Sequence, residues 1–196
     1  MQLKVVCLTS WAKLVITICA IALLLNGCAS HPPFSQHASY VDPDRFMGTW
    51  HTISNIPYFA ERGKVATNSN YIRRGPNKYD DIFESRKKNF DAPVKKLTGT
   101  MKSLNDNNNE WQSTFYKIIS SKFTVLYIDE DYQIALLGHK SRKYGWVFSR
   151  NKQMSDDDYA KAMSIFNQNG FDIQKFKKVP QFQNQLGLTD FQGSVK

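Results

Sequence analysis

The stretch DRFMGTWHTISNIPYFAERG (residues 44–63) contains a glycine two residues before a tryptophan, at the start of an expected β-strand. Gly48 lets the chain bend sharply as it enters this strand, because it has no Cβ atom. Trp50 then brings the heaviest aromatic side chain to one end of the strand. Alternate residues of a strand share a face, so we expect Thr52 and Ser54 to point to the same side as Trp50.

Short strands separated by turn-forming residues continue as far as residue 150. Their connections are mostly of hairpin length and are rich in Gly, Pro, Asn, Asp and Ser. We expect eight strands, at residues 48–53, 66–73, 79–86, 94–103, 110–117, 123–128, 132–138 and 144–150. The pattern predicts an all-β fold, an eight-stranded antiparallel up-and-down barrel, whose closure leaves no free strand edge.

One amphipathic segment follows the strands. Ser155 is a suitable N-cap, and the apolar residues after it recur at helical spacing, which predicts an α-helix at about 156–169. Its single apolar stripe places this helix outside the barrel. A short ninth strand is expected at 171–176 and completes a domain of residues 42–180, after which residues 181–196 form a polar tail.

Residues 1–27 have the features of a signal peptide: two lysines, a short apolar run, and then LNGC at residues 25–28. The LNGC sequence resembles a bacterial lipobox. This resemblance implies cleavage before Cys28 and attachment of acyl chains to that residue, which would anchor the chain to a membrane. An ordinary signal peptide with a chance cysteine is the alternative. Residues 28–41, rich in Pro, Ser, His and Ala, are expected to form a lipidated tether.

The residue after Cys28 bears on the location of the protein, because lipoprotein sorting in Gram-negative bacteria retains chains with Asp at this position in the inner membrane. Ala29 therefore points to the outer membrane, at either its periplasmic face or the cell surface. Apart from Cys28, the chain that remains after cleavage has no thiol for a disulfide, a metal site or a nucleophile.

The chain that remains after cleavage is strongly basic. Removal of Lys4 and Lys13 leaves 24 of the 26 Lys and Arg residues against 17 Asp and Glu residues, a net charge of about +7. Solvated surfaces and charged strand edges account for such an excess, and attraction to anionic lipid head groups is the alternative. Nucleic acid is not expected as a partner of an exported lipoprotein.

Three segments together resemble the lipocalin family, and specifically the bacterial outer-membrane lipoprotein lipocalins. The first is the Gly-x-Trp strand and the loop after it, residues 44–63. The second is VLYIDEDYQIALLG (residues 125–138), with an Asp and a Tyr in a turn between two strands, and the third is YGWVFSR (residues 144–150), a strand that ends in Arg. The segments occur in the family's order and spacing, and the resemblance covers about residues 42–179.

The resemblance implies a structural role for Gly48, Trp50, Asp129, Tyr132 and Arg150. Trp50 would close the floor of the barrel, with Arg150 from the last strand lying across its ring. Such a cation–π contact contributes ~0.5–2 kcal/mol, and the guanidinium donors can also fix the segment before the first strand. Asp129 and Tyr132 would form a turn near the same end.

An eight-stranded barrel has room for one small ligand, and the resemblance implies a membrane-anchored protein that stores or transports hydrophobic molecules. Fatty acids or lysophospholipids fit such a cup, with the head group at the rim near Lys87, Lys88 and Arg73. His51 and Thr52 replace the family's usual residues after the tryptophan, so the wall of the cup has to be inferred from strand alternation. That alternation predicts as wall residues Thr52, Ser54, Trp111, Phe115, Val125, Tyr127, Ile134, Leu136, Trp146 and Phe148.

No arrangement of a nucleophile, a base or metal ligands indicates catalysis. The chain has no Gly-x-Ser-x-Gly elbow, and its four histidines lack the spacing of a metal site. We therefore expect a non-enzymatic protein without a metal or a cofactor. The alternative function is a surface-tethered scaffold that contacts another envelope protein, with a barrel filled by Trp111, Trp146 and Phe148. The sequence is also compatible with a homodimer.

Overall fold

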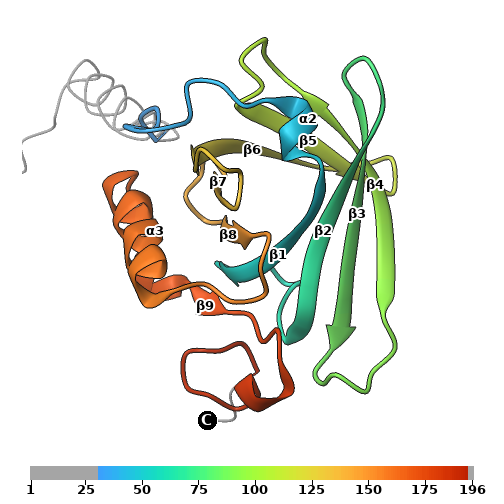
Figure 1. Cartoon of the computed structure of the whole chain (residues 1–196), viewed down its shortest axis with the longest axis vertical. Helices are drawn as coiled ribbons and strands as arrows, with labels where there is room; N and C mark the ends of the chain where they lie inside the picture. Colours follow the sequence, from blue (N-terminus) through green and yellow to red (C-terminus); the bar gives the residue numbers. More distant parts are fainter. Residues whose placement is uncertain (1–30, 194–196) are drawn as a thin grey trace, which may run out of the picture. The chain divides into compact units, whose positions relative to one another are not determined.

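Eight antiparallel strands form a closed ring (Figure 1) in the structure, a computed structural model that describes residues 31–193. The ring closes because β1 pairs with β2 on one side and with β8 on the other. This arrangement confirms the predicted barrel. The strands are β1 (Gly48–Asn55), β2 (Lys64–Gly75), β3 (Lys78–Lys87), β4 (Lys95–Ser103), β5 (Glu110–Phe115), β6 (Ile119–Ile128), β7 (Ile134–Gly138) and β8 (Gly145–Ser149).

The inside of the barrel and its outer wall carry separate hydrophobic clusters. The inner cluster joins side chains from the strands and from the segment before β1, among them Trp50, Tyr79 and Trp111. The outer cluster forms where helix α3 (Asp156–Gln168) packs against the wall, and it includes Leu136 and Phe166. Both clusters lie within one compact unit that begins at Pro33, so this unit has its own core.

Helix α3 begins where the sequence predicts. Ser155 is its N-cap, and the Ser155 hydroxyl accepts a hydrogen bond from Asp158 N. Three aspartates occupy the first turn, where the helix dipole favours negative charge. Figure 1 shows the helix outside the ring, beside β7 and β8.

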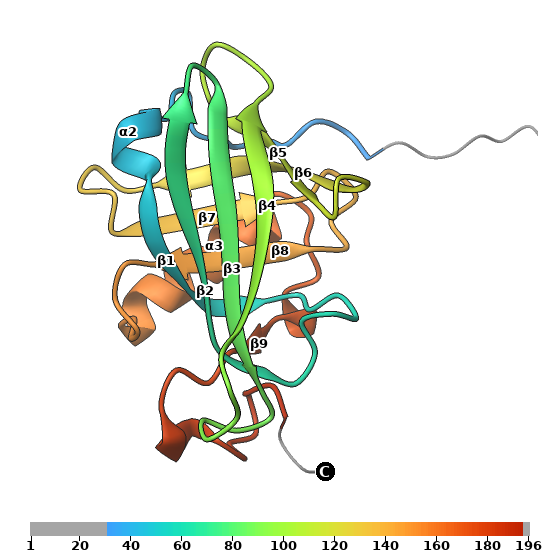
Figure 2. The ribbon, with the colours of Figure 1, turned by 90° about the vertical axis from the view of Figure 1, so that its right-hand side faces the viewer.

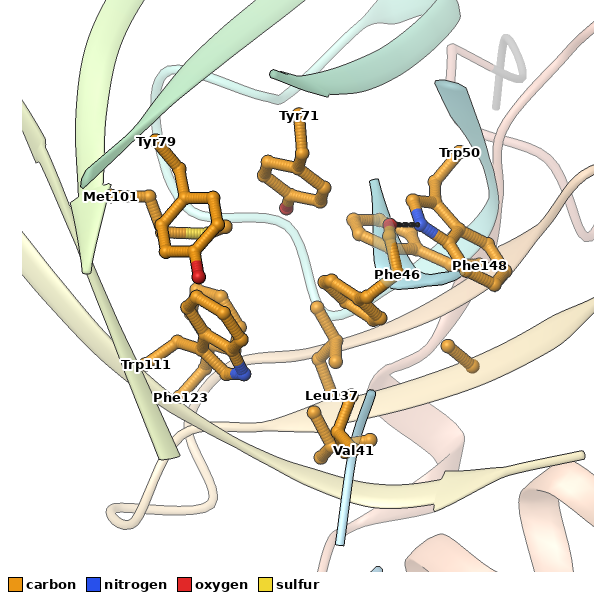
Figure 3. Packing of buried hydrophobic residues seen from close by; sticks show 12 residues of the cluster. Val41, Phe46, Trp50, Tyr71, Tyr79, Met101, Trp111, Phe123, Leu137 and Phe148 are labelled. Atoms are coloured by element: carbon orange, nitrogen blue, oxygen red, sulfur yellow. Dashed lines mark hydrogen bonds between the residues drawn. The ribbon is translucent and has the colours of Figure 1, made fainter. Parts of the chain in front are cut away.

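A short helix that we did not predict, α2 (Pro43–Phe46), precedes the first strand. Asp42 caps it by accepting from Asp44 N and Arg45 N, and a proline suits its first turn because it needs no amide there. The helix delivers Phe46 into the barrel, where its ring is fully buried. In Figure 3 the ring of Phe46 lies among the other inner side chains.

The ninth strand lies later than the expected 171–176. β9 (Lys177–Lys178) pairs with the end of β1, while Ile173–Lys175 form a 3-10 helix. The reason is packing: Phe171 and Phe176 both contact the ring of Phe166, with centroid distances of 5.0 and 4.5 Å. Two side chains five residues apart can meet one ring when the chain turns between them, whereas an extended strand would separate them.

The described part of the expected tether does not stand clear of the barrel. Residues 33–41 run along it instead, because their main chain finds partners there. Ala38 N donates to Val125 O at 2.9 Å, and the ring of Phe34 stacks on that of Phe171 at 5.9 Å. Cys28 and the signal segment lie outside the described residues.

The expected polar tail is also partly buried. Gln181 donates through Nε2 to Thr52 O at 2.9 Å and to Thr67 O at 3.0 Å. Gln192 donates through Nε2 to Asn55 Oδ1 at 2.6 Å. The C-terminal segment thus packs on β1 and β2, where Gln181 satisfies two main-chain carbonyls and Gln192 pairs with the side chain of Asn55.

Candidate functional site

The up-and-down order of the strands gives the barrel two distinct ends. At the closed end lie α2 and the connections β2–β3, β4–β5 and β6–β7. At the open end lie the other four connections, β1–β2 (56–63), β3–β4 (88–94), β5–β6 (116–118) and β7–β8 (139–144). Figure 2 shows β2, β3 and β4 side by side as one wall between these ends.

Arg150 closes one end by lying over the ring of Trp50, with its guanidinium carbon 3.8 Å from the ring centroid. Its donors meet main-chain carbonyls of the entering segment, at Arg45 O (2.8 Å), Met47 O (2.7 Å) and Thr49 O (2.9 Å). Hydrogen bonds from a charged donor contribute about 1.5–3 kcal/mol each when they are well formed. The guanidinium therefore fixes the chain that leads into β1.

Asp129 and Tyr132 shape the β6–β7 turn at the same end. Asp129 Oδ1 accepts from Gln133 N at 2.8 Å and from Ile134 N at 2.5 Å. Tyr132 has a φ of +58°, and its hydroxyl accepts a hydrogen bond from Asp42 N at 2.8 Å. The turn thus holds the N-cap of α2, and all these contacts are structural ones.

Six of the ten expected wall residues lie on the inner face of the barrel. Cross-strand partners share a face, so the pairing of Thr52 with Phe148 places both inside. The ring of Phe115 folds over Gly99, where a Cβ atom would lie 2.6 Å from it. The inner residues are Thr52, Trp111, Phe115, Val125, Trp146 and Phe148.

The other four, Ser54, Tyr127, Ile134 and Leu136, lie on the outer face beneath α3, which corrects our expectation for them. A β-bulge between Thr52 and Ser54 changes the alternation of β1, and the Ser54 hydroxyl accepts from Tyr159 of the helix at 3.0 Å. A second bulge, in β6, turns Tyr127 outward, where its hydroxyl accepts a hydrogen bond from Lys161 Nζ at 2.8 Å.

The expectation that Ile134 and Leu136 point inward extends the strand alternation from Tyr132. It fails because Tyr132 lies in the turn and not in the strand. The expected rim residue Arg73 also lies elsewhere. It stands near the closed end and pairs with Asp44 of α2 at 2.5 Å. Lys87 and Lys88 remain beside the open end, at the start of the β3–β4 connection.

The packing inside the barrel changes from the closed end to the open end. Around the floor, Phe46, Trp50 and Trp111 have no exposed surface. Nearer the open end the apolar inner side chains keep some accessible surface, and these half-buried residues are Phe83, Leu97, Phe115 and Trp146. A pocket of about 240 Å³ lies outside the barrel, among Ile53, Tyr159 and Lys178.

Two acidic side chains are buried inside the barrel wall. Asp81 is 4% exposed, and its Oδ2 accepts from Ser113 at 2.6 Å, while its Oδ1 has no hydrogen-bond partner in the described structure. Glu61 is 6% exposed and accepts from Trp146 Nε1 at 2.9 Å and from Asn55 Nδ2 at 2.8 Å. Within residues 31–193 no Lys or Arg forms an ion pair with either carboxyl.

Burial controls the protonation of both carboxyls. It raises the pKa of Glu61 to about 7, although hydrogen bonds from Trp146, Tyr58 N and Asn55 oppose the shift. It raises the pKa of Asp81 to about 6, against the hydrogen bond from Ser113. The inner wall therefore changes charge close to neutral pH, and it disfavours an anionic group placed deep in the barrel.

The sequence patterns missed three of these residues. Phe46 was missed because helix α2, which carries it into the barrel, was not predicted. Asp42 followed by Pro43 is nevertheless a signal for the start of a helix. Asp81 follows Asp80 directly, which gives no sign of burial, yet the alternation from Tyr79 places Asp81 inside the barrel. Glu61 gave no signal of burial because it lies in a loop.

Comparison with known proteins gives a consistent family for this chain. A model described as the lipocalin-like domain matches residues 41–181. Temperature-induced lipocalin-1 of Arabidopsis thaliana is 29% identical over 151 residues, which cover 70% of this chain and 78% of that protein. Outer membrane lipoprotein Blc of Escherichia coli (strain K12) is 26% identical over 170 residues, which cover 82% and 92%.

Solved structures share the fold at lower identity. Insecticyanin from the tobacco hornworm Manduca sexta matches with a TM-score of 0.62 and 16% identity, covering 79% of this chain and 87% of its own. Apocrustacyanin C2 matches with a TM-score of 0.60 and 13% identity, covering 73% and 81%. Among the described residues, no helix has the length and apolar character needed to cross a bilayer.

Proposed function

The chain belongs to the lipocalin family, and from that premise we propose that it binds a small hydrophobic ligand in the open half of its barrel. It would store or transport this ligand in a bacterial cell envelope. The observation that carries the proposal is the apolar inner surface near the open end, where Phe83, Leu97, Phe115 and Trp146 stay half-buried. The packed floor beneath them limits how deep a ligand reaches.

We propose fatty acids or lysophospholipids as the ligand class. An acyl chain gains ~0.8 kcal/mol for each methylene that leaves water, before the cost of ordering. The buried carboxyls of Asp81 and Glu61 favour insertion of the tail rather than of an anionic head group. The head group would stay at the open end, where Lys87 and Lys88 are exposed.

We further propose that acylation of Cys28 anchors the protein to the outer membrane. Cys28 lies outside the described residues, so the support is the LNGC sequence and the similarity to a protein named as an outer membrane lipoprotein, of which the matched region covers 92%. The proposed role is non-enzymatic; within residues 31–193 no group of His, Cys, Asp or Glu side chains could hold a metal ion.

A scaffold with a filled barrel is the second candidate, and the dense inner packing favours it. Trp111 and Phe148, which we named as fillers, both belong to the inner cluster, and Trp146 packs against it. In that case the barrel would be a rigid body whose loops or outer wall contact another envelope protein.

Titration of the chain from residue 29 onward with a fluorescent fatty acid and a fluorescent lysophospholipid separates the two candidates. Ligand binding predicts saturable uptake in the micromolar range, with quenching of the half-buried Trp146. Binding should weaken when Phe115→Asp places a charge on the inner face, whereas the outer-face control Ile72→Asp should bind as the parent does. Absence of saturable binding to the folded protein would reject the carrier and favour the scaffold.

A further inference from the structure

Large apolar side chains are exposed on the connections at the open end. Phe59 in β1–β2 and Ile118 in β5–β6 are each 83% exposed, Tyr116 is 67% exposed, and Val94 in β3–β4 is 44% exposed. Exposed apolar side chains that gather on one face of a protein mark an interaction site, because water contact with them is unfavourable. Three neighbouring connections of the four at the open end share this feature.

The two ends of the barrel differ in the balance of their charges. The exposed basic residues of the open-end connections are Arg62, Lys88, Lys117, Lys140 and Lys143, with Asp91 as the exposed acidic residue among them. The closed-end connections and α2 carry Asp42, Asp44, Asp106, Asp129, Glu130 and Asp131 against Arg45, and the adjoining strand ends add the basic residues Arg73, Arg74, Lys78, Lys102 and Arg150. The open end is therefore clearly basic around the exposed apolar side chains, whereas at the closed end acidic and basic residues balance.

The N-terminal segment leads to the same end. Val41 N donates to Asn107 O beside the closed end, and the chain then runs back along the barrel to Phe34. The guanidinium of Arg142, in the β7–β8 turn, lies 4.4 Å from the ring centroid of Phe34. If Cys28 is acylated, a point that rests on the proposed function, its lipid is attached six residues before a position at the open end.

From these observations we propose that the open end docks on a bilayer that contains anionic phospholipids. Phe59, Tyr116 and Ile118 insert among the acyl chains near the head groups, and the surrounding lysines contact lipid phosphates. Basic residues close to an anionic membrane surface are attracted to it. The barrel mouth then faces the membrane, and an acyl ligand would pass between them without crossing water. Charge complementarity favours a lipid surface over a second copy of this basic end.

The test uses the unacylated chain from residue 29 onward, which contains the complete compact unit. Its partitioning is measured by sedimentation with vesicles of phosphatidylcholine alone and of phosphatidylcholine with phosphatidylglycerol. We expect clear binding to the anionic vesicles and at least tenfold weaker binding to the neutral ones. Because no fluorescent ligand is present, failure of docking leaves the ligand-binding proposal intact.

Two pairs of variants locate the docking surface. Phe59→Ser with Ile118→Ser, and separately Lys88→Glu with Lys117→Glu, should each reduce partitioning about tenfold or more. The matched closed-end pairs, Tyr40→Ser with Leu104→Ser and Lys78→Glu with Lys102→Glu, should partition as the parent does.

Three results would overturn the proposal. The first is equal binding to the neutral and the anionic vesicles. The second is an equal loss of binding in the closed-end variants. The third is an open-end double variant that changes the monomer–dimer equilibrium in analytical ultracentrifugation but leaves vesicle binding unchanged, since this would assign the surface to a second copy of the chain.

Discussion

The two ends of the barrel hold their polar groups in different ways. At the closed end the guanidinium of Arg150 donates to main-chain carbonyls, and Trp50 Nε1 donates to Phe46 O at 2.8 Å. Above this floor, Asp81 keeps an unpartnered carboxyl oxygen inside the barrel, and in the β1–β2 connection at the open end burial raises the pKa of Glu61 to about 7. The comparison indicates that the floor provides stability, whereas the interior above it and the open-end connection retain buried carboxyls that lower stability, as functional regions often do.

The largest effect should come from the closed end. Arg150→Ala removes a cation–π contact and leaves carbonyls without donors, so we expect a loss of about 2–4 kcal/mol in the free energy of unfolding. Urea denaturation measures this loss. The control Arg74→Ala removes only a surface ion pair with Asp80 and should cost about 1 kcal/mol or less. Equal effects of the two substitutions would contradict the assigned role of Arg150.

The second effect is a pH dependence that originates inside the barrel. Burial raises the pKa of Asp81 from 3.8 to about 6, so the folded state binds this proton more tightly than the unfolded state does. The resulting stability is present below pH 3.8 and is lost as the pH rises through about 6. Above that pH, Asp81→Asn should therefore be more stable than the parent by on the order of 2 kcal/mol.

Chemical denaturation across this pH range checks the prediction. The neighbouring substitution Asp80→Asn is a matched control, because Asp80 lies on the surface in an ion pair with Arg74 at 2.7 Å. It should leave the slope of stability against pH unchanged. A parent protein whose stability does not fall between pH 4 and pH 7 would show that the interior does not shift Asp81.

A smaller effect should appear in ligand binding. Leu97→Asn replaces a half-buried apolar side chain on the inner face of the open half and should weaken binding of a fluorescent fatty acid about fivefold. Ile82→Asn, on the outer face of the neighbouring strand, should bind the probe normally. If the outer substitution weakened binding as much as the inner one, the ligand would lie outside the open half.

The smallest effect concerns the tip of the β1–β2 connection. Phe59 is 83% exposed, so Phe59→Ser should change the free energy of unfolding by no more than about 0.5 kcal/mol. Phe46→Ser, a substitution at a fully buried floor residue, is the opposite case and should destabilise severely. A marked loss of stability in Phe59→Ser would show that this ring packs in the folded protein.

The strand pattern and the three resembling segments predicted the barrel, the outer helix and the side-by-side position of Trp50 and Arg150. The barrel and the helix depend on alternation and spacing, which the sequence carries locally, whereas the contact of Trp50 with Arg150 was implied by the resemblance. Ser54 and Tyr127 could not be placed correctly, because a β-bulge inserts one residue without a distinctive sequence signal. The burial of Glu61 depends on Asn55 and Trp146, which only the folded chain brings together.

The path of residues 33–41 along the barrel limits how far the barrel domain can lie from a membrane. If Cys28 carries lipid, only the short linker from Cys28 to Pro33 lies between the membrane anchor and a segment that packs on the barrel. Five residues span at most about 18 Å when fully extended. That is less than the width of the barrel domain itself, given a radius of gyration of about 15 Å for a compact unit of this size. The barrel domain would therefore stay close to the bilayer surface rather than move freely away from it.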